Sequence, residues 1–257
     1  MGKYFTVEVK PTIDVAALKV AFADAEVLFD WLGFDVPKGP SKLIGVTSRY
    51  TGLNGVDQVV GDLELFWSKT VAGNAPGTLG DDGAAVDTFG WFPHIIGKTF
   101  MDASNGANDG DLIMGNIIVS GAPGGGVFAS TNQSNLPMNN GLILQGEPDS
   151  GTNVGYDKLY VAAIAKAVHL WGASTMTVNG SMSTSSPVLT VADLSPVLSG
   201  VSPGDVLRDE DGLLFGTVKS IDSATQITME DNLVATSTDD KVVYNTTPIT
   251  LILSFEK

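Results

Sequence analysis

Hydrophobic and polar residues alternate with a period of two along much of the chain, which is the pattern of a half-buried β-strand. The clearest runs are residues 4–10, which stop before Pro11, and residues 62–67. Further strand-type segments are residues 25–31, 43–50, 112–119 and 141–145. The alanine-rich residues 159–171 suit a helix by composition, but they follow a glycine-rich turn. We therefore interpret them as a long core strand and keep the helix as the alternative.

Three long segments rich in glycine, asparagine and aspartate separate these strands, at residues 71–87, 101–111 and 120–140. Loops of this length are uncommon in a compact domain unless they cover a surface or contact a partner. In a β-sandwich, such connections lie at the ends or edges of the sheets. We therefore expect contacts with partners to be made there.

The sequence changes character near Ser174 and is rich in serine and threonine from residue 183. Short, evenly spaced strand patterns follow at residues 187–192, 205–208, 213–221, 226–229 and 241–244. The run Asp-Glu-Asp-Gly at residues 209–212 reads as a hairpin turn, in which Gly212 supplies a positive φ. Five short strands within about 60 residues are typical of a small β-barrel.

The last run, residues 249–255, alternates regularly and is apolar on one side. Such a strand is not expected to remain an exposed edge. We expect it to return to the first sheet, which makes the small barrel an insertion. The sequence thus predicts a mainly β protein with a β-sandwich at residues 1–174, completed by the C-terminal strand 248–257, and a small barrel at residues 175–247.

Composition narrows the class of protein. The chain has 257 residues, no cysteine, and 29 acidic against 14 basic side chains, so its formal net charge is −15. The lack of cysteine excludes a disulfide framework and sulfur-ligated zinc or iron–sulfur sites. The acidic balance argues against binding nucleic acid or an anionic membrane. No apolar stretch suits a transmembrane helix, and no signal-peptide core precedes residue 10, so we expect synthesis and folding in a cytoplasm.

Candidate catalytic chemistry is sparse. His94 and His169 are the two histidines, and no Gly-x-Ser-x-Gly elbow accompanies them, so we interpret both as packed or surface residues. The glycine-rich residues 121–126 lack the Gly-Lys-Ser/Thr of a phosphate-binding loop. Trp67 and Trp91 suit a sugar platform or a core equally, and no acidic pair stands out for glycoside hydrolysis. The sequence therefore predicts no catalytic residue, no cofactor and no enzyme activity.

One loop is a weak candidate for a metal site. Asp102, Asn105, Asp109 and Asp111 lie close together in the sequence. Carboxylate and amide oxygens at this density suit a hard cation such as Ca²⁺. The spacing does not match an EF-hand, which also needs a bidentate glutamate at its end. We therefore favour a solvated turn and expect no metal.

Four segments of the first 70 residues form a pattern together with Asn-Ala-Pro at 74–76 and Asp-Asp at 81–82; they are residues 7–14, 22–29, 34–43 and 62–67. By this pattern, residues 1–70 resemble a family of tailed-bacteriophage virion proteins. Members of the family show a Tyr-Ala-x-Gly-Asp-Val-Leu segment. This chain departs from it at Ala25 and Glu26, which replace the glycine and the aspartate without changing the strand character.

A second stretch is similar to small barrels appended to phage head and tail proteins. It comprises residues 202–207, Gly212 and residues 215–218. Together the two resemblances imply a jelly-roll-like β-sandwich with a small SH3/OB-like β-barrel inserted near the C-terminus. They also imply a virion structural protein, above all a capsid decoration (cement) protein on the capsid exterior.

The same resemblance implies the partners. These are the major capsid protein and further copies of this chain, for example in a trimer. Nucleic acid and membranes are not expected as partners. The alternative role is a tail, baseplate or fibre component that binds a receptor or glycan. A carbohydrate-active enzyme is a third hypothesis, for which the sequence nominates no acidic pair.

Overall fold

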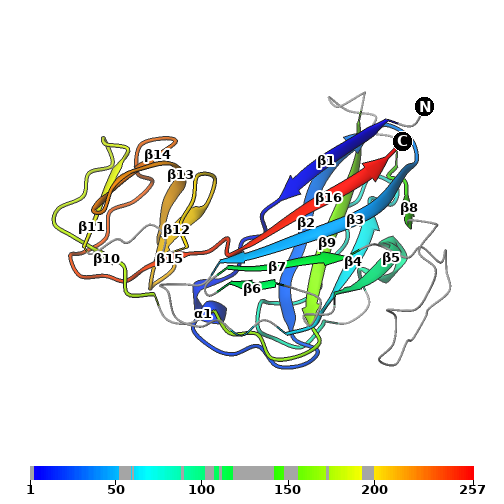
Figure 1. Ribbon diagram of the computed structural model, residues 1–257, viewed down its shortest axis with the longest axis horizontal. Helices are drawn as coiled ribbons and strands as arrows, with labels where there is room; N and C mark the ends of the chain where they lie inside the picture. Colours follow the sequence, from blue (N-terminus) through cyan, green and yellow to red (C-terminus); the bar gives the residue numbers. More distant parts are fainter. Residues whose placement is uncertain are drawn as a thin grey trace.

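A computed structural model describes residues 3–51, 59, 61–87, 90–101, 107–109, 112–117, 142–147, 156–171, 174–192 and 200–257. In these residues the protein is mainly β, with three antiparallel sheets, one 3₁₀ turn (η1, Phe92–His94) and one four-residue helix, α1 (Val15–Leu18) (Figure 1). None of the described helices has the length and apolar character that a membrane span requires. The mainly β class expected from the sequence is confirmed.

The first sheet has the strand order β1-β16-β3-β7-β6, and β8 also pairs with β3. Its strands are β1 (Tyr4–Val9), β16 (Ile249–Glu256), β3 (Ser41–Thr51), β7 (Leu112–Ile117), β6 (Ala107–Asp109) and β8 (Leu142–Leu144). The last strand of the chain therefore lies between β1 and β3, where Phe255 is opposite both Phe5 and Leu43. The last strand of the chain is thus an interior strand of the sheet that also contains the first strand.

The second sheet packs against the first in a sandwich-like arrangement. Its order is β2-β9-β4-β5, with β2 (Val27–Pro37), β9 (Tyr156–Ala165), β4 (Leu63–Lys69) and β5 (Ile95–Met101). One core cluster joins both sheets. Within it the Phe34 ring lies 6.3 Å from Trp67 on its own sheet and 6.5 Å from Phe255 on the other. Alternation along each strand directs these rings inward and leaves polar side chains outside.

The third sheet, here called the small sheet, has its own core. Its order is β10-β11-β14-β13-β12-β15. The strands are β10 (Thr177–Val178), β11 (Val188–Ala192), β14 (Gln226–Met229), β13 (Leu214–Ser223), β12 (Val206–Asp209) and β15 (Val243–Asn245). Fully buried side chains such as Leu189, Phe215 and Ile227 fill a cluster separate from the first. Figure 1 shows the small sheet beside the first and second sheets.

A buried ion pair joins the two parts of the molecule, and we call this contact the junction. The Lys10 ammonium donates to Asp205 Oδ1 at 2.9 Å and to the Pro203 carbonyl at 3.1 Å. The Asp205 side chain is 3% exposed. Its other oxygen accepts bonds from the Ser202 amide and from Asn245 Nδ2, at 2.8 and 2.9 Å. A buried carboxylate with this many donors is well compensated for its lost hydration.

Two further contacts support the junction from the segment after β1. The Ile13 amide donates to the Thr246 carbonyl at 2.7 Å. The Lys19 ammonium donates to the Glu210 carbonyl at 2.6 Å and lies 5.4 Å from the centre of the Tyr244 ring. Contacts at Lys10, Ile13 and Lys19 therefore hold the segment around α1 against the part of the chain that contains the small sheet.

Several elements differ from the sequence-based expectations. Residues 95–101, which carried no strand prediction, form β5, and residues 107–109 form β6 inside a segment expected to be a loop. Gly97 interrupts the apolar pattern of β5 because a Cβ there would lie 2.6 Å from the Leu142 side chain. Residues 159–171 were expected to be one strand, but β9 ends at Ala165. The hairpin turn is confirmed, with Gly212 at φ +85° and its amide bonded to the Asp209 carbonyl.

Replacement of Phe255 by alanine tests the packing of β16. The Phe255 ring is fully buried and stacks on Phe5 with 5.1 Å between centroids. We expect Phe255→Ala to lower the free energy of unfolding by about 3–5 kcal/mol, measured by urea unfolding with tryptophan fluorescence. The neighbouring Ser254→Ala, on the outer face, is the control and should change stability by less than about 0.5 kcal/mol. A loss below about 1 kcal/mol for Phe255→Ala would contradict this packing.

Candidate functional site

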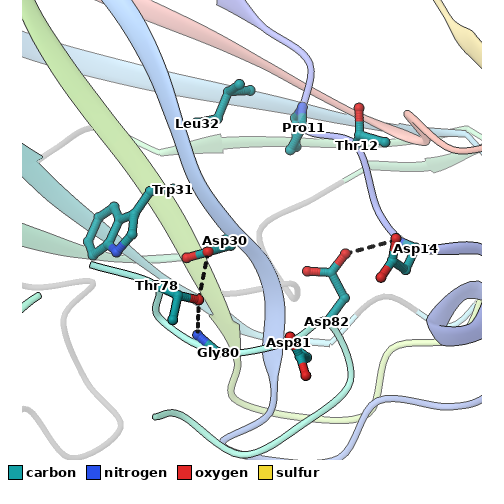
Figure 2. A pocket seen from close by; sticks show the side chains of 10 residues that line it. All are labelled: Pro11, Thr12, Asp14, Asp30, Trp31, Leu32, Thr78, Gly80, Asp81 and Asp82. Atoms are coloured by element: carbon teal, nitrogen blue, oxygen red, sulfur yellow. Dashed lines mark hydrogen bonds between the residues drawn. The ribbon is translucent and has the colours of Figure 1, made fainter. Parts of the chain in front are cut away.

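A pocket with four carboxyl groups lies beside the junction, and we call it the acidic pocket. Its volume is about 330 Å³. The segment after β1 forms one wall, β2 forms another, and the loop after β4 closes it from below in Figure 2. The lining residues are Pro11, Thr12, Asp14, Asp30, Trp31, Leu32, Thr78, Gly80, Asp81 and Asp82. Pro11 and Thr12 follow Lys10 directly, so the junction also positions this wall.

Asp30, on β2, fixes the loop that forms the floor. Its two carboxylate oxygens accept bonds from the Leu79 amide at 2.7 Å and the Thr78 hydroxyl at 2.8 Å. The Gly80 amide donates to the same hydroxyl oxygen at 3.1 Å. Gly80 has φ +144° and a Cβ there would lie 3.0 Å from Val27, so the close approach of loop and strand requires glycine.

Asp82 links the loop to the other wall. Its Oδ2 accepts the Asp14 amide hydrogen at 2.8 Å, as Figure 2 shows. Burial raises the pKa of the Asp82 carboxyl from 3.8 to about 6, and the negative charges of Asp14 and Asp30 add to this rise. The hydrogen bond from the Asp14 amide opposes it, because it stabilises the charged form. Asp82 is therefore a group whose charge changes between mildly acidic and neutral pH.

The four carboxyl groups of the pocket suit a positively charged occupant. None of the four carboxylates forms an ion pair with a described residue. In the described part of the chain no three histidine, aspartate or glutamate side chains are grouped to hold a metal ion. The Trp31 ring points away from Asp81 and Asp82 in Figure 2 and lies 6.5 Å from Trp91 instead. It is thus not placed as a platform for a ligand among the carboxylates.

Both histidines are packed residues, as the sequence indicated. His94 is 8% exposed, and its Nδ1 lies 2.9 Å from the Lys69 carbonyl. His169 is fully buried, with Nε2 at 3.1 Å from the Asp62 carbonyl. Burial lowers the pKa of His169, so its neutral form is favoured. Neither residue lines the acidic pocket.

The loop proposed as a weak metal site falls largely outside the described residues. This applies to Asp102, Asn105 and Asp111, whereas Asp109 is the last residue of β6. The glycine-rich residues 121–126 also lie outside them. Of the tryptophans weighed as sugar platforms, Trp67 is fully buried and donates to the Thr99 hydroxyl at 3.2 Å. It is a core residue.

The acidic pocket itself was not predicted from the sequence. Asp14, Asp30 and the Asp81–Asp82 pair lie in three separate segments, each of which reads alone as a turn or a strand end. Their approach depends on the pairing of β2 with β9 and on the return of β16, which are long-range contacts. The nearest signal is the run Gly-Asp-Asp-Gly at residues 80–83, which marks a tight acidic loop.

Comparisons of the chain with protein-family models, with curated proteins and with solved structures found no match.

The raised pKa of Asp82 has a consequence for stability. The folded state binds a proton more tightly than the unfolded state, so this contribution is complete below about pH 3.8 and is lost as the pH rises through about 6. We expect the free energy of unfolding of wild type, minus that of Asp82→Asn, to fall by about 1–2 kcal/mol from pH 4 to pH 7, after allowance for solvent screening. Buried His169 changes stability with pH in the opposite direction, because its pKa is lowered. Both proteins contain His169, so the subtraction removes its contribution.

Urea unfolding at a series of pH values measures this difference. Asp81→Asn is the matched control, because Asp81 is the neighbouring residue and its side chain is exposed. A pH-independent difference for Asp82→Asn, or an equal slope for Asp81→Asn, would contradict the assignment to Asp82.

Proposed function

We propose that this chain is a structural protein of a tailed-bacteriophage virion, namely a capsid decoration (cement) protein that binds the outer surface of the shell. One observation carries the proposal. The two stretches that resemble phage virion proteins are in direct contact, because Lys10 of the first forms the buried ion pair with Asp205 of the second. Two resemblances found independently in the sequence therefore belong to one joined unit.

The physical properties of the chain suit this role. A decoration protein has to be stiff, and here two separate cores are joined by an ion pair whose aspartate is buried and hydrogen-bonded at both oxygens. It also has to stay soluble before assembly, and a net charge of −15 favours solubility. The same charge repels a packaged genome, so nucleic acid is not among the proposed partners.

For the architecture we propose a jelly-roll-like sandwich at residues 1–174, completed by residues 248–257, with an inserted SH3/OB-like barrel at residues 175–247. The central position of β16 beside β1 supports the insertion. The two ends of the small sheet approach each other through the bridge between Thr177 and Val242, and the Val178 amide donates to the Lys241 carbonyl at 2.8 Å. These contacts support a closed small sheet.

The proposed partners are the major capsid protein and further copies of this chain, for example a trimer at a symmetry axis of the shell. A tail, baseplate or fibre component is the second candidate. It is favoured by the small sheet, which has its own core and lies to one side of the sandwich in Figure 1, as an attachment module would. We propose no enzyme activity and no cofactor.

Immunogold electron microscopy of the phage whose genome encodes this chain tests the proposal. An antibody raised against the purified protein should label the capsid surface, and antibody pre-adsorbed with the protein is the control. Label confined to the tail would contradict decoration and favour the second candidate, for which a glycan array with purified protein is the next measurement. Particles without any label would exclude both roles.

A further inference from the structure

One edge of the first sheet is unpaired in the described chain. β1 is the terminal strand of the sheet and forms its margin in Figure 1. Lys3 and Lys257 exchange both backbone hydrogen bonds, at 3.1 and 2.9 Å. The direction of backbone hydrogen bonds alternates along an antiparallel strand. The backbone amides and carbonyls of the odd-numbered residues of β1 therefore point toward β16. The amides and carbonyls of Tyr4, Thr6 and Glu8 therefore point away from the sheet, and we call this row the edge of β1.

The edge of β1 has few of the features that block strand addition. All six residues of β1 pair with β16 without a register shift, whereas the pairing of β16 with β3 contains one. β1 contains no proline or glycine, and Glu8 is its one charged side chain. Natural proteins blunt edges with bulges, prolines and repeated charges. A regular, uninterrupted edge is instead a template on which another chain can add a strand.

The acidic pocket lies in line with this edge. Pro11 and Thr12, which follow β1 almost directly, form one of its walls. At about 3.3 Å per residue, roughly 13 Å of extended chain separates Glu8 from Thr12. A strand added antiparallel to β1 would carry its own N-terminal residues past Lys10 and into the pocket. Lys10 does not neutralise the pocket, because it is bound to Asp205.

We propose that the edge of β1 binds an extended segment of a shell subunit, antiparallel, with one or two basic side chains of that segment entering the acidic pocket. Charge complementarity selects this occupant, because Asp14, Asp30, Asp81 and Asp82 have no ion-pair partner among the described residues. A second copy of this chain, at a net charge of −15, is disfavoured by the same criterion. The source of the segment rests on the proposed function, whereas its chemistry follows from the edge and the pocket.

A synthetic probe tests the surface without the virus. The acetylated peptide amide Lys-Lys-Thr-Val-Thr-Val-Thr-Val-Thr places its lysines opposite Pro11 and Thr12 when its other residues pair with β1. In ¹⁵N-labelled full-length protein, titration should shift the amide resonances of Tyr4, Thr6 and Glu8. Replacing the two lysines by glutamates should weaken binding by at least about tenfold, because like charges then meet in the pocket. Absence of shifts at these amides would overturn the proposal.

Three substitutions separate the effect of strand pairing from the effect of charge. The Thr6 amide points away from β16, so Thr6→Pro removes no bond of the sheet but blocks an added strand. Thr6→Pro should abolish the shifts, whereas Thr6→Val, which keeps the amide, should bind as wild type. Asp81→Asn alters an exposed pocket residue. It should weaken binding of the lysine peptide but not binding of a peptide in which both lysines are replaced by glutamine. Equal binding by Thr6→Pro and Thr6→Val, with both folded by their NMR spectra, would contradict strand addition.

Particle binding then identifies the source of the segment. Phage particles stripped of this protein are incubated with wild type, Thr6→Pro or Thr6→Val, and bound protein is measured after sedimentation. We expect wild type and Thr6→Val to bind, and Thr6→Pro to lose at least about tenfold in bound protein. Equal binding of all three would overturn the proposed edge and leave decoration standing. No binding by wild type would reject decoration, while the peptide titration would still decide whether the edge of β1 accepts a basic strand.

Discussion

The buried pair of Lys10 and Asp205 is the contact on which the rest of the structure depends. A carboxylate that is 3% exposed keeps its charge at low cost only when donors surround it, and Lys10, Ser202 and Asn245 supply them. Because Lys10 comes directly after β1, the pair fixes the end of the first sheet relative to the small sheet. It also places Pro11 and Thr12, and with them one wall of the acidic pocket.

β16 follows the small sheet in the sequence but lies inside the first sheet, so the chain itself links the two cores. β16 is central in the first sheet, so the sandwich cannot be completed before residues 175–247 have been synthesised. The chain crossing that leads back into β16 lies near the junction, since the Ile13 amide bonds to the Thr246 carbonyl. Contacts so distant in sequence slow folding, but they also hold the two parts in one arrangement. A fixed arrangement of stiff sheets is what a protein that binds by shape requires.

Much of the fold was predictable from local patterns, because strands with one wet face alternate visibly. Residues 43–50 and 249–255 lie in strands, as do all but Lys10 of residues 4–10 and all but Asp62 of residues 62–67, and Gly212 occupies its expected turn. β5 escaped prediction because Gly97 and Lys98 break its apolar pattern. The reason for Gly97 is a tertiary contact, since a Cβ there would lie 2.6 Å from the Leu142 side chain. Asp14 and Asp30 carried no local signal, and Asp81 and Asp82 marked only a tight acidic loop, since the approach of the four aspartates is a product of tertiary structure. The same holds for Lys10 and Asp205, which are 195 positions apart.

A double-mutant cycle on the junction tests the central claim, which is that Lys10 and Asp205 act as one unit. The free energies of unfolding of Lys10→Met, Asp205→Asn and the double variant are compared with that of wild type. The more exposed pair of Lys42 and Glu256, 3.7 Å apart with both side chains 34% exposed, provides the reference cycle. We predict a coupling energy of about 1–3 kcal/mol for the buried pair and below about 0.5 kcal/mol for the exposed one. Additive effects at Lys10 and Asp205 would contradict the claim that this contact holds the two cores together.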